Sequence, residues 1–173
     1  MDLDNMSYHE KRKITQNDDT PNDVLWELAK DSYTQVRRNV ANRPSTPVDI
    51  LRYLAKDRDP RVKDSVAKHS NTPEDVLGEL TKDEDAAVRC YVAHNPNTSL
   101  VALWELAKDE EQIVRYAVAC NPKSSGKLLV TLFECEKNMK HPSSTILISL
   151  YGNKKIPAFV KRVIETLFGE MLD

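Results

Sequence analysis

Glycine, aromatic residues and paired cysteines are all scarce in this chain. Its 173 residues include only 4 Gly and 6% aromatic side chains, too few for the turns and aromatic-rich strands of an all-β sandwich. Three Cys without a Cys-x-x-Cys pair argue against a disulfide framework and favour a reducing compartment. A net charge of −2 gives no general attraction to nucleic acid or to an anionic membrane.

Long apolar runs are also missing. The first residues, MDLDNMSYHEKRK, contain no apolar core of a signal peptide, and no later segment approaches the length of a membrane span. The overall composition, 40% hydrophobic and 30% charged, is typical of helices that are exposed on one side. We therefore expect a cytoplasmic protein.

Catalytic motifs are missing as well. The sequence has no Gly-rich phosphate loop, Gly-x-Ser-x-Gly, His-Glu-x-x-His or Cys-x-x-Cys motif, and its 4 His are scattered. Paired acids such as Asp18–Asp19 and Glu110–Glu111 fall in loops or at helix starts, where they act as caps. The sequence therefore predicts no enzyme and no cofactor.

What the chain does contain is a repeat of 26 residues. Thr20, Thr46, Thr72 and Thr98 stand at the same position, and Ser124 follows one period later. The four blocks that begin at these Thr residues align without a gap: TPNDVLWELAKD, TPVDILRYLAKD, TPEDVLGELTKD and TSLVALWELAKD. Self-similarity at a fixed period predicts a repeat architecture.

Each unit predicts two short helices. In the first, helix A, Thr at the N-cap and Pro at the first helical position would start the helix, and apolar residues form one stripe. The second, helix B, turns a Val-x-x-x-Val-Ala pattern inward, as at Val36, Val40 and Ala41. Helix B should end where the next residue is Pro, since the residue before Pro avoids the helical region. Because such short helices need neighbours, the sequence predicts an all-α fold, an α-solenoid that forms a right-handed superhelix.

The pattern weakens at both ends of the chain. Residues 1–19 fit an N-terminal half-unit, in which Ser7 and Glu10 have the spacing of a capping box. Residues 20–123 hold the four regular units, and residues 124–173 continue as a degenerate fifth unit with a C-terminal capping helix. Terminal units that break the pattern are typical of solenoids, so we predict one continuous domain.

The C-terminal part departs furthest from the repeat. An apparent four-residue insertion falls around ECEKNMKH, and HPSSTILISLYGN at residues 141–153 looks like a modified helix B. A last helix is expected to begin near Pro157. Its buried residues would be Val160, Val163, Ile164 and Leu167.

The unit TPxDVLxxLAKDxxxxVRxxVAxNP resembles the leucine-rich-repeat-variant family, and its Asp-x5-Arg spacing also resembles HEAT repeats. The resemblance covers residues 20–123 closely and the remainder loosely. It implies an α-solenoid, and such families mostly build noncatalytic interaction surfaces. The founding leucine-rich-repeat-variant pattern has an N-terminal Cys cluster that holds an iron–sulfur centre. This chain has no such cluster, so the resemblance implies no cofactor.

Two charged columns accompany the repeat, six residues apart. The acidic column is Asp31, Asp57, Asp83 and Asp109. The basic column is Arg37, Lys63, Arg89 and Arg115. The spacing resembles the HEAT ladder, in which Asp contacts the backbone or the Arg of a neighbouring unit. We favour this structural interpretation over an anion-binding stripe, because the acidic column would cancel the field of the basic one.

Two further columns lie on helix A. Lys residues recur near its end, at Lys30, Lys56, Lys82 and Lys108. We interpret them as a solvated face, since cations suit a helix C-terminus, and a row that follows a nucleic-acid backbone is the alternative. Trp26 and Trp104 share a position at the edge of the apolar stripe, where half-buried packing with a Lys contact is expected.

The outer side of helix B is the candidate binding surface, because it lies opposite the inward Val and Ala residues. In the first two units this side is polar and includes Arg38, Arg61 and Lys68. In the next two units it carries Ala87, Cys90, Tyr91, His94, Ile113, Tyr116 and Cys120. An exposed apolar and aromatic cluster indicates an interface, so we predict a protein partner here, with the basic residues as an extension.

Three alternatives remain open for these residues. The C-terminal segment could fold over the apolar cluster and bury it as core. Cys90, His94 and Cys120 could approach zinc, but neighbouring helices lie about 8–10 Å apart and no fourth ligand is evident, so we predict no metal. The chain could also bind nucleic acid, because stacked helix pairs resemble the HEAT-like DNA glycosylases. The negative net charge and the small aromatic cluster argue against that function.

Overall fold

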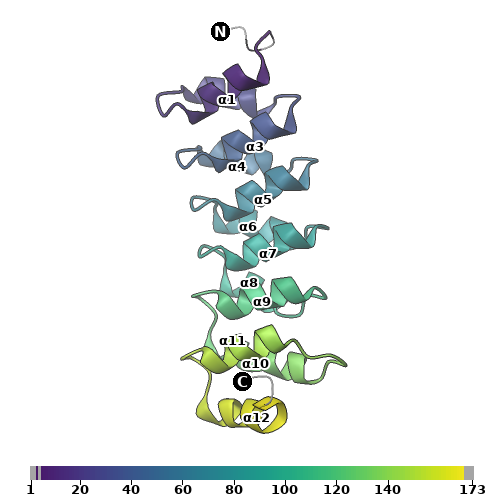
Figure 1. Cartoon of the computed structure of the whole chain (residues 1–173). Coiled ribbons are helices and arrows are strands. Elements are labelled where there is room, and N and C mark those ends of the chain that lie inside the picture. Colours follow the sequence, from purple (N-terminus) through teal and green to yellow (C-terminus); the bar gives the residue numbers. More distant parts are fainter. Residues whose placement is uncertain (1–2, 4, 170–173) are drawn as a thin grey trace.

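The computed structural model describes residue 3 and residues 5–169 (Figure 1). This part of the chain is all-α. Its helices are α1 (Tyr8–Gln16), α2 (Asn22–Ala29), α3 (Thr34–Asn42), α4 (Val48–Leu54), α5 (Pro60–Lys68), α6 (Glu74–Leu80), α7 (Ala86–His94), α8 (Leu100–Leu106), α9 (Gln112–Cys120), α10 (Gly126–Lys137), α11 (Ser144–Gly152) and α12 (Ala158–Phe168). Across the described residues, no helix has the length and apolar character that crossing a membrane requires.

The helices stack as a regular column, with α1 at one end and α12 at the other (Figure 1). The odd-numbered helices are the B helices, and each of them packs on the next odd-numbered helix. The even-numbered helices from α2 to α10 are the A helices, and each packs against the B helix of its own unit, whereas the last described helix, α12, packs against α11. The predicted α-solenoid of two-helix units is therefore confirmed.

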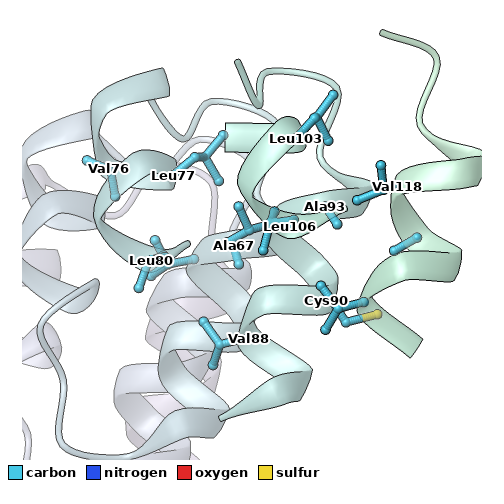
Figure 2. Packing of buried hydrophobic residues seen from close by; sticks show 14 of the residues in the cluster. Ala67, Val76, Leu77, Leu80, Val88, Cys90, Ala93, Leu103, Leu106 and Val118 are labelled. Atoms are coloured by element: carbon cyan, nitrogen blue, oxygen red, sulfur yellow. The ribbon is translucent and has the colours of Figure 1, made fainter. Parts of the chain in front are cut away.

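The core is the set of apolar side chains that every unit repeats. Val36, Val40 and Ala41 of α3 are fully buried, and their counterparts in α5, α7 and α9 are buried too. Leu77 and Leu80 of α6 join them from the A row, and the buried side chains form one continuous cluster (Figure 2). Helices of two to three turns are marginal alone in water, so this burial between units stabilises them.

The Thr column has a different role from the one predicted. Thr72 does not cap helix A, because extended backbone at Pro73 (ψ 153°) makes Pro73 the N-cap and starts α6 one residue later. The Thr72 hydroxyl donates instead to the carbonyl oxygen of Val66, 2.6 Å away at the end of α5. Thr20, Thr46, Thr98 and Ser124 donate to the preceding helix in the same way. The column therefore satisfies carbonyls that a helix end leaves free.

The acidic and basic columns form an ion-pair ladder between units, as predicted. Its links are Lys11–Asp31, Arg37–Asp57, Lys63–Asp83, Arg89–Asp109 and Arg115–Glu136. In the second link, Arg37 Nε lies 2.6 Å from Asp57 Oδ2, and the two side chains are 7% and 6% exposed. The Arg37 Nη1 atom also donates to the Asp31 carbonyl oxygen of its own unit. The ladder fastens adjacent units, and each of its basic side chains is paired with a carboxylate.

Each ladder aspartate also organises the turn before the next B helix. The second carboxylate oxygen of Asp57 accepts from the Asp59 N–H at 2.9 Å, and that of Asp109 accepts from the Glu111 N–H. Burial alone would raise the pKa of the Asp57 carboxyl, but the hydrogen bonds from Arg37 and from the Asp59 N–H outweigh it and lower the pKa. The carboxylate is therefore held in its charged form.

A second ladder joins the ends of the B helices. Its members are Arg43, His69, Asn95 and Asn121, which we call the carbonyl ladder. Each is buried and reaches backbone carbonyls of the preceding unit, as when Asn121 Nδ2 donates to Ala93 O at 2.6 Å. His69 Nδ1 accepts from the Asn71 N–H, so the proton lies on Nε2, which faces Arg43 O at 2.8 Å. The sequence indicated only that these residues precede a turn.

The insertion in the fifth unit is longer than predicted. The starts of α10 at Gly126 and α11 at Ser144 are 18 residues apart, whereas those of α8 at Leu100 and α9 at Gln112 are 12 apart. The unit thus carries six extra residues, not four. Part of the extra length extends α10, which places the fully buried Glu136 opposite the basic column.

Gly126, the first residue of α10, is required by a close backbone approach. A Cβ atom at this position would meet the Lys155 carbonyl oxygen at 2.7 Å. The Lys155 side chain adds hydrogen bonds to the same region, since its Nζ donates to Pro122 O at 2.6 Å and to Ser124 O at 3.1 Å, both just before α10. The loop after α11 is therefore fastened to the start of α10.

The last helix begins after Pro157, as predicted, but buries fewer residues. Val160 and Ile164 are buried, whereas Val163 is half-buried and Leu167 is 58% exposed. Helix α11 covers one side of α12 and leaves the side of Leu167 open. The prediction for Leu167 was wrong because the apolar residues of α12 are spread over more than one side of the helix.

Candidate functional site

The B helices present one continuous outer face, which we call the helix-B face. It consists of the residues opposite the buried Val and Ala pairs on α3, α5, α7, α9 and α11. The predicted site residues on this face differ in how far their side chains are exposed. Arg61, Lys68, Ala87, His94, Ile113 and Cys120 are exposed, whereas Arg38, Tyr91 and Tyr116 are half-buried. All of these lie on the surface that the helical wheel predicted.

Cys90 is the exception, because it is buried at 5% exposure. Its side chain turns toward the following B helix (Figure 2), and Sγ lies 3.7 Å from the Ile113 carbonyl oxygen. Sγ is also 3.7 Å from His94 Nδ1. Cys90 was predicted as a small side chain of the contact surface, but it is more buried than that role requires, because α7 and α9 pack closely enough to cover it. Burial also raises the pKa of the Cys90 thiol, which therefore stays neutral.

The C-terminal segment adds a further B helix, α11, to the helix-B face and leaves part of the apolar cluster exposed. Helix α11 stacks beside α9 as the next B helix, and Gln112 Nε2 donates to Ser143 Oγ at 2.6 Å between them. Ile113 nevertheless stays 56% exposed. The alternative in which this segment buries Ile113 as core was therefore wrong, although Tyr116 is half-buried and in contact with Ser149.

The apolar part of the face surrounds a cavity of about 400 Å³. The lining residues are Glu111, Gln112, Ile113, Tyr116 and Thr145. Ile148 stands on α11 at the position that Tyr116 has on α9, and it is 48% exposed. The sequence analysis missed Thr145 and Ile148, because the six extra residues displaced them from the repeat. Aligning the helix starts at Gln112 and Ser144 would have found both.

Tyr116 stands on α9 near the start of α11. The groups that act on its hydroxyl are Cys120 of its own helix and Ser149 of α11. The contact with Cys120 raises the pKa of the Tyr116 hydroxyl, and the contact with Ser149 opposes that change. The half-buried Tyr116 side chain therefore lines the cavity on the side of α9.

The basic part of the face lies on α3 and α5. Arg61 pairs with Asp59, its own N-cap, with Nη2 2.7 Å from Oδ2. Lys68 Nζ lies over the Tyr91 ring of α7, 3.7 Å from its centroid, which is a cation–π contact. Arg38 forms no ion pair with Asp64 in the described residues, and Arg38 Nε and Asp64 Oδ1 lack hydrogen-bond partners. Burial raises the pKa of the Asp64 carboxyl.

Neither the cysteines nor the histidines form a recognisable metal centre. Within residue 3 and residues 5–169, no group of three or more His, Cys, Asp or Glu side chains is placed to hold a metal ion. His94 and Cys120 are exposed and Cys90 is buried. Of the three residues considered as zinc ligands, two are therefore open to solvent and one is not.

The columns on helix A lie away from the helix-B face. Lys30, Lys56, Lys82 and Lys108 are exposed, as the interpretation of a solvated face requires. Trp26 is half-buried, with Lys30 Nζ 5.9 Å from its ring centroid and the Tyr53 ring edge-on at 5.6 Å. The predicted Trp–Lys packing is therefore confirmed at Trp26.

Comparison with known proteins supports the repeat and leaves the partner open. Neither the curated proteins nor the solved structures gave a significant match. A sequence model of the family described as leucine rich repeat variant matches residues 34–59. These residues run from the start of α3 to the N-cap of α5, which is one full period of the stack. The resemblance to leucine-rich-repeat-variant units is thus confirmed, with residues 34–59 as the segment that the family model matches.

Proposed function

We propose that the chain is a noncatalytic protein-interaction module that binds a protein partner on the helix-B face. The observation that carries the proposal is that Ile113 and Tyr116 line the cavity between α9 and α11, with the exposed Ile148 one helical turn beyond the lining residue Thr145 on α11. Apolar side chains gathered around a hollow are typical of the buried centre of an interface. Buried aromatic anchors at such a centre supply most of the binding energy in many complexes.

Other exposed apolar side chains have a different arrangement. Val101 of α8 is 71% exposed and Tyr53 of α4 is 45% exposed, but they lie on separate helices of the A row. Single apolar residues on a surface are normal in monomeric proteins and need no partner. A cavity of about 410 Å³ also lies beside Tyr53, but its other lining residues are polar or charged, whereas the cavity at Ile113 and Tyr116 lies within the apolar part of the helix-B face.

A noncatalytic role agrees with how the polar side chains are used. The acidic and basic side chains that repeat along the chain pair with each other in the ion-pair ladder, and most of them are buried. The carbonyl ladder uses the buried Asn and His side chains in the same structural way. We place the module in the cytoplasm, because the free cysteines Cys90, Cys120 and Cys135 suit a reducing compartment.

The proposal is tested by affinity purification from an extract of the source cells, followed by mass spectrometry. We expect Ile113→Glu and Tyr116→Glu to lose at least one protein that the wild type retains. Val101→Glu, which adds the same charge on helix A, should retain it. Circular dichroism must first show that all three variants are folded. Equal recovery by all three variants would contradict the proposal.

Nucleic acid is the second class of partner to test. The observation that favours nucleic-acid binding is the exposure of the whole Lys column, Lys30, Lys56, Lys82 and Lys108. The basic members of the ion-pair ladder are unavailable for phosphate, since each is paired with a carboxylate. We therefore expect weak binding to duplex DNA at moderate salt, with little change when the Lys column is reversed to Glu. Tight binding that disappears on reversal would favour nucleic acid.

A further inference from the structure

We propose that the partner segment is acidic at one end and carries a large apolar side chain at the other, lying along the solenoid axis. This inference rests on the proposed function of the helix-B face and adds the chemistry and direction of its occupant. The acidic end would lie over α3 and α5, and the apolar side chain would enter the cavity between α9 and α11. Three features of the face support it.

The first feature is an excess of positive charge at one end of the face. Arg38, Arg61 and Lys68 lie there, and exposed Arg12 of α1 stands one period before Arg38. Three acidic groups lie near them. Asp64 is half-buried, Asp59 already accepts from the Arg61 side chain and N–H, and Asp85 caps α7, where its carboxylate accepts from the Ala87 N–H. The whole chain has a net charge of −2, so this excess is local. Complementary charge selects an acidic partner and orients it.

The second feature is the change in character toward α9 and α11. The cavity of about 400 Å³ is lined by Ile113, Tyr116 and Thr145, and no Lys or Arg is among its lining residues. Glu111 stands at this cavity and would repel an acidic group placed there. An apolar side chain therefore fits this end, and an acidic one fits the opposite end.

The third feature is a contact between the basic end of the face, on α3 and α5, and its apolar end, toward α9 and α11. The Lys68 side chain of α5 is exposed and lies over the Tyr91 ring of α7, with 3.7 Å between Nζ and the ring centroid. Its ammonium group can meet a carboxylate on one side while the ring continues the apolar surface on the other. A single segment can thus contact both halves without crossing a gap in the face.

The spacing of the helices sets the length of the segment. Two to three steps separate the basic helices α3 and α5 from α9, and packed helices lie about 8–10 Å apart. The span is therefore about 16–30 Å, which an extended chain covers in about 5–9 residues. We expect acidic residues at that separation from the apolar anchor. Nucleic acid fits the face less well, because Asp64 and Glu111 interrupt any basic path along it.

The test uses a phage-displayed library of random peptides of about 12 residues, long enough for this span, selected on the immobilised full chain. We expect enriched peptides to combine an acidic cluster with a Leu, Phe or Trp about 5–9 residues away. The double variant Arg38→Glu/Lys68→Glu should weaken their binding by about tenfold or more. Lys56→Glu, a reversal on helix A, should leave binding unchanged.

The outcomes separate this inference from the proposed function. Enriched peptides that lack acidic residues but lose binding to Ile113→Glu would overturn the acidic partner and keep the helix-B face. Peptides that bind all face variants equally would contradict both proposals, as would a library that yields no binder. Duplex DNA that displaces the enriched peptides at moderate salt would assign the basic end to nucleic acid and also overturn the inference.

Discussion

Arg115 and Glu136 form the most buried link of the ion-pair ladder. Arg115 Nε lies 2.5 Å from Glu136 Oε1, and the two side chains are 5% and 0% exposed. Glu136 Oε2 also accepts from the Ser143 N–H, at the N-cap of α11. One carboxylate therefore connects α9, α10 and α11, and it attaches the irregular fifth unit to the regular stack.

Replacing Glu136 by Gln should lower the free energy of unfolding by about 3–5 kcal/mol, because the buried Arg115 guanidinium loses its charge partner. Urea denaturation followed by circular dichroism measures this change. The matched control is Asp75→Asn, since Asp75 pairs with Arg52 at the surface, where the side chains are 61% and 45% exposed. The control should leave the midpoint unchanged. Equal effects of the two substitutions would show that burial does not set the strength of the ladder.

The ladder aspartates predict a loss of stability in acid. Burial acts to raise the pKa of the Asp109 carboxyl, but the hydrogen bonds from Arg89 and the Glu111 N–H lower it below the ordinary 3.8. The unfolded chain therefore binds more protons just below that pH, and stability falls as the pH drops from about 4 toward the folded pKa. The advantage of the wild type over Asp109→Asn should be constant near neutral pH and shrink below about pH 4.

Asp64 is a control for Asp109, because its pKa is shifted in the opposite direction. Burial raises the pKa of its carboxyl above 3.8, so charging it disfavours the folded state. Asp64→Asn should then be more stable than the wild type at neutral pH, and this gain should disappear below about pH 4. Chemical denaturation at several pH values measures both differences. If Asp64→Asn and Asp109→Asn change stability in the same direction at neutral pH, the assignment of the two carboxylates is wrong.

The carbonyl ladder can be tested at Asn121. Its Nδ2 donates to Ala93 O at 2.6 Å, and its Oδ1 accepts from the Lys123 N–H at 2.8 Å. Asn121→Ala should lower the free energy of unfolding by about 1–3 kcal/mol, because Ala93 O is left buried without this donor. Asn42→Ala removes an exposed Asn and should have little effect. A small effect at Asn121 would mean that water replaces the lost donor.

Two glycines in the A row should respond oppositely to alanine. Gly78 lies within α6, and a Cβ there meets nothing within 4 Å, so Gly78→Ala should stabilise the protein by about 0.5–1 kcal/mol. Gly126→Ala should destabilise it, because the new Cβ would lie 2.7 Å from the Lys155 backbone oxygen. Thermal unfolding of both variants measures the contrast. A stabilising Gly126→Ala would mean that the loop at Lys155 moves freely.

The stack could be predicted because the same physical requirement is repeated in every unit. Rows of Val, Ala and Leu recur at fixed spacing, and stacking the units removes them from water. The structure buries the repeated Val and Ala residues of every regular helix B, and on helix A it leaves Val24 half-buried. The ion-pair ladder followed from charge, since six-residue spacing of Asp and Arg brought opposite charges to neighbouring units. Repetition made these features visible in a single sequence.

Features that depend on distances between helices could not be predicted in the same way. A helical wheel places Cys90 outside, but it does not show how closely α9 approaches α7. Thr72 was expected at an N-cap because its sequence neighbour is Pro, yet its hydroxyl binds the carbonyl of Val66. Ile148 was missed because the insertion hid its equivalence to Tyr116. In each case the deciding contact lies outside the local sequence.

The central claim is that a protein partner contacts the helix-B face at the cavity between α9 and α11. The most direct measurement is photo-crosslinking with benzoylphenylalanine at position 113, compared with position 101 on helix A, in the source cells. We predict a crosslinked protein at Ile113 that is missing at Val101, with the attached peptide identified by mass spectrometry. The same crosslinked protein at both positions, or at Val101 alone, would contradict the account.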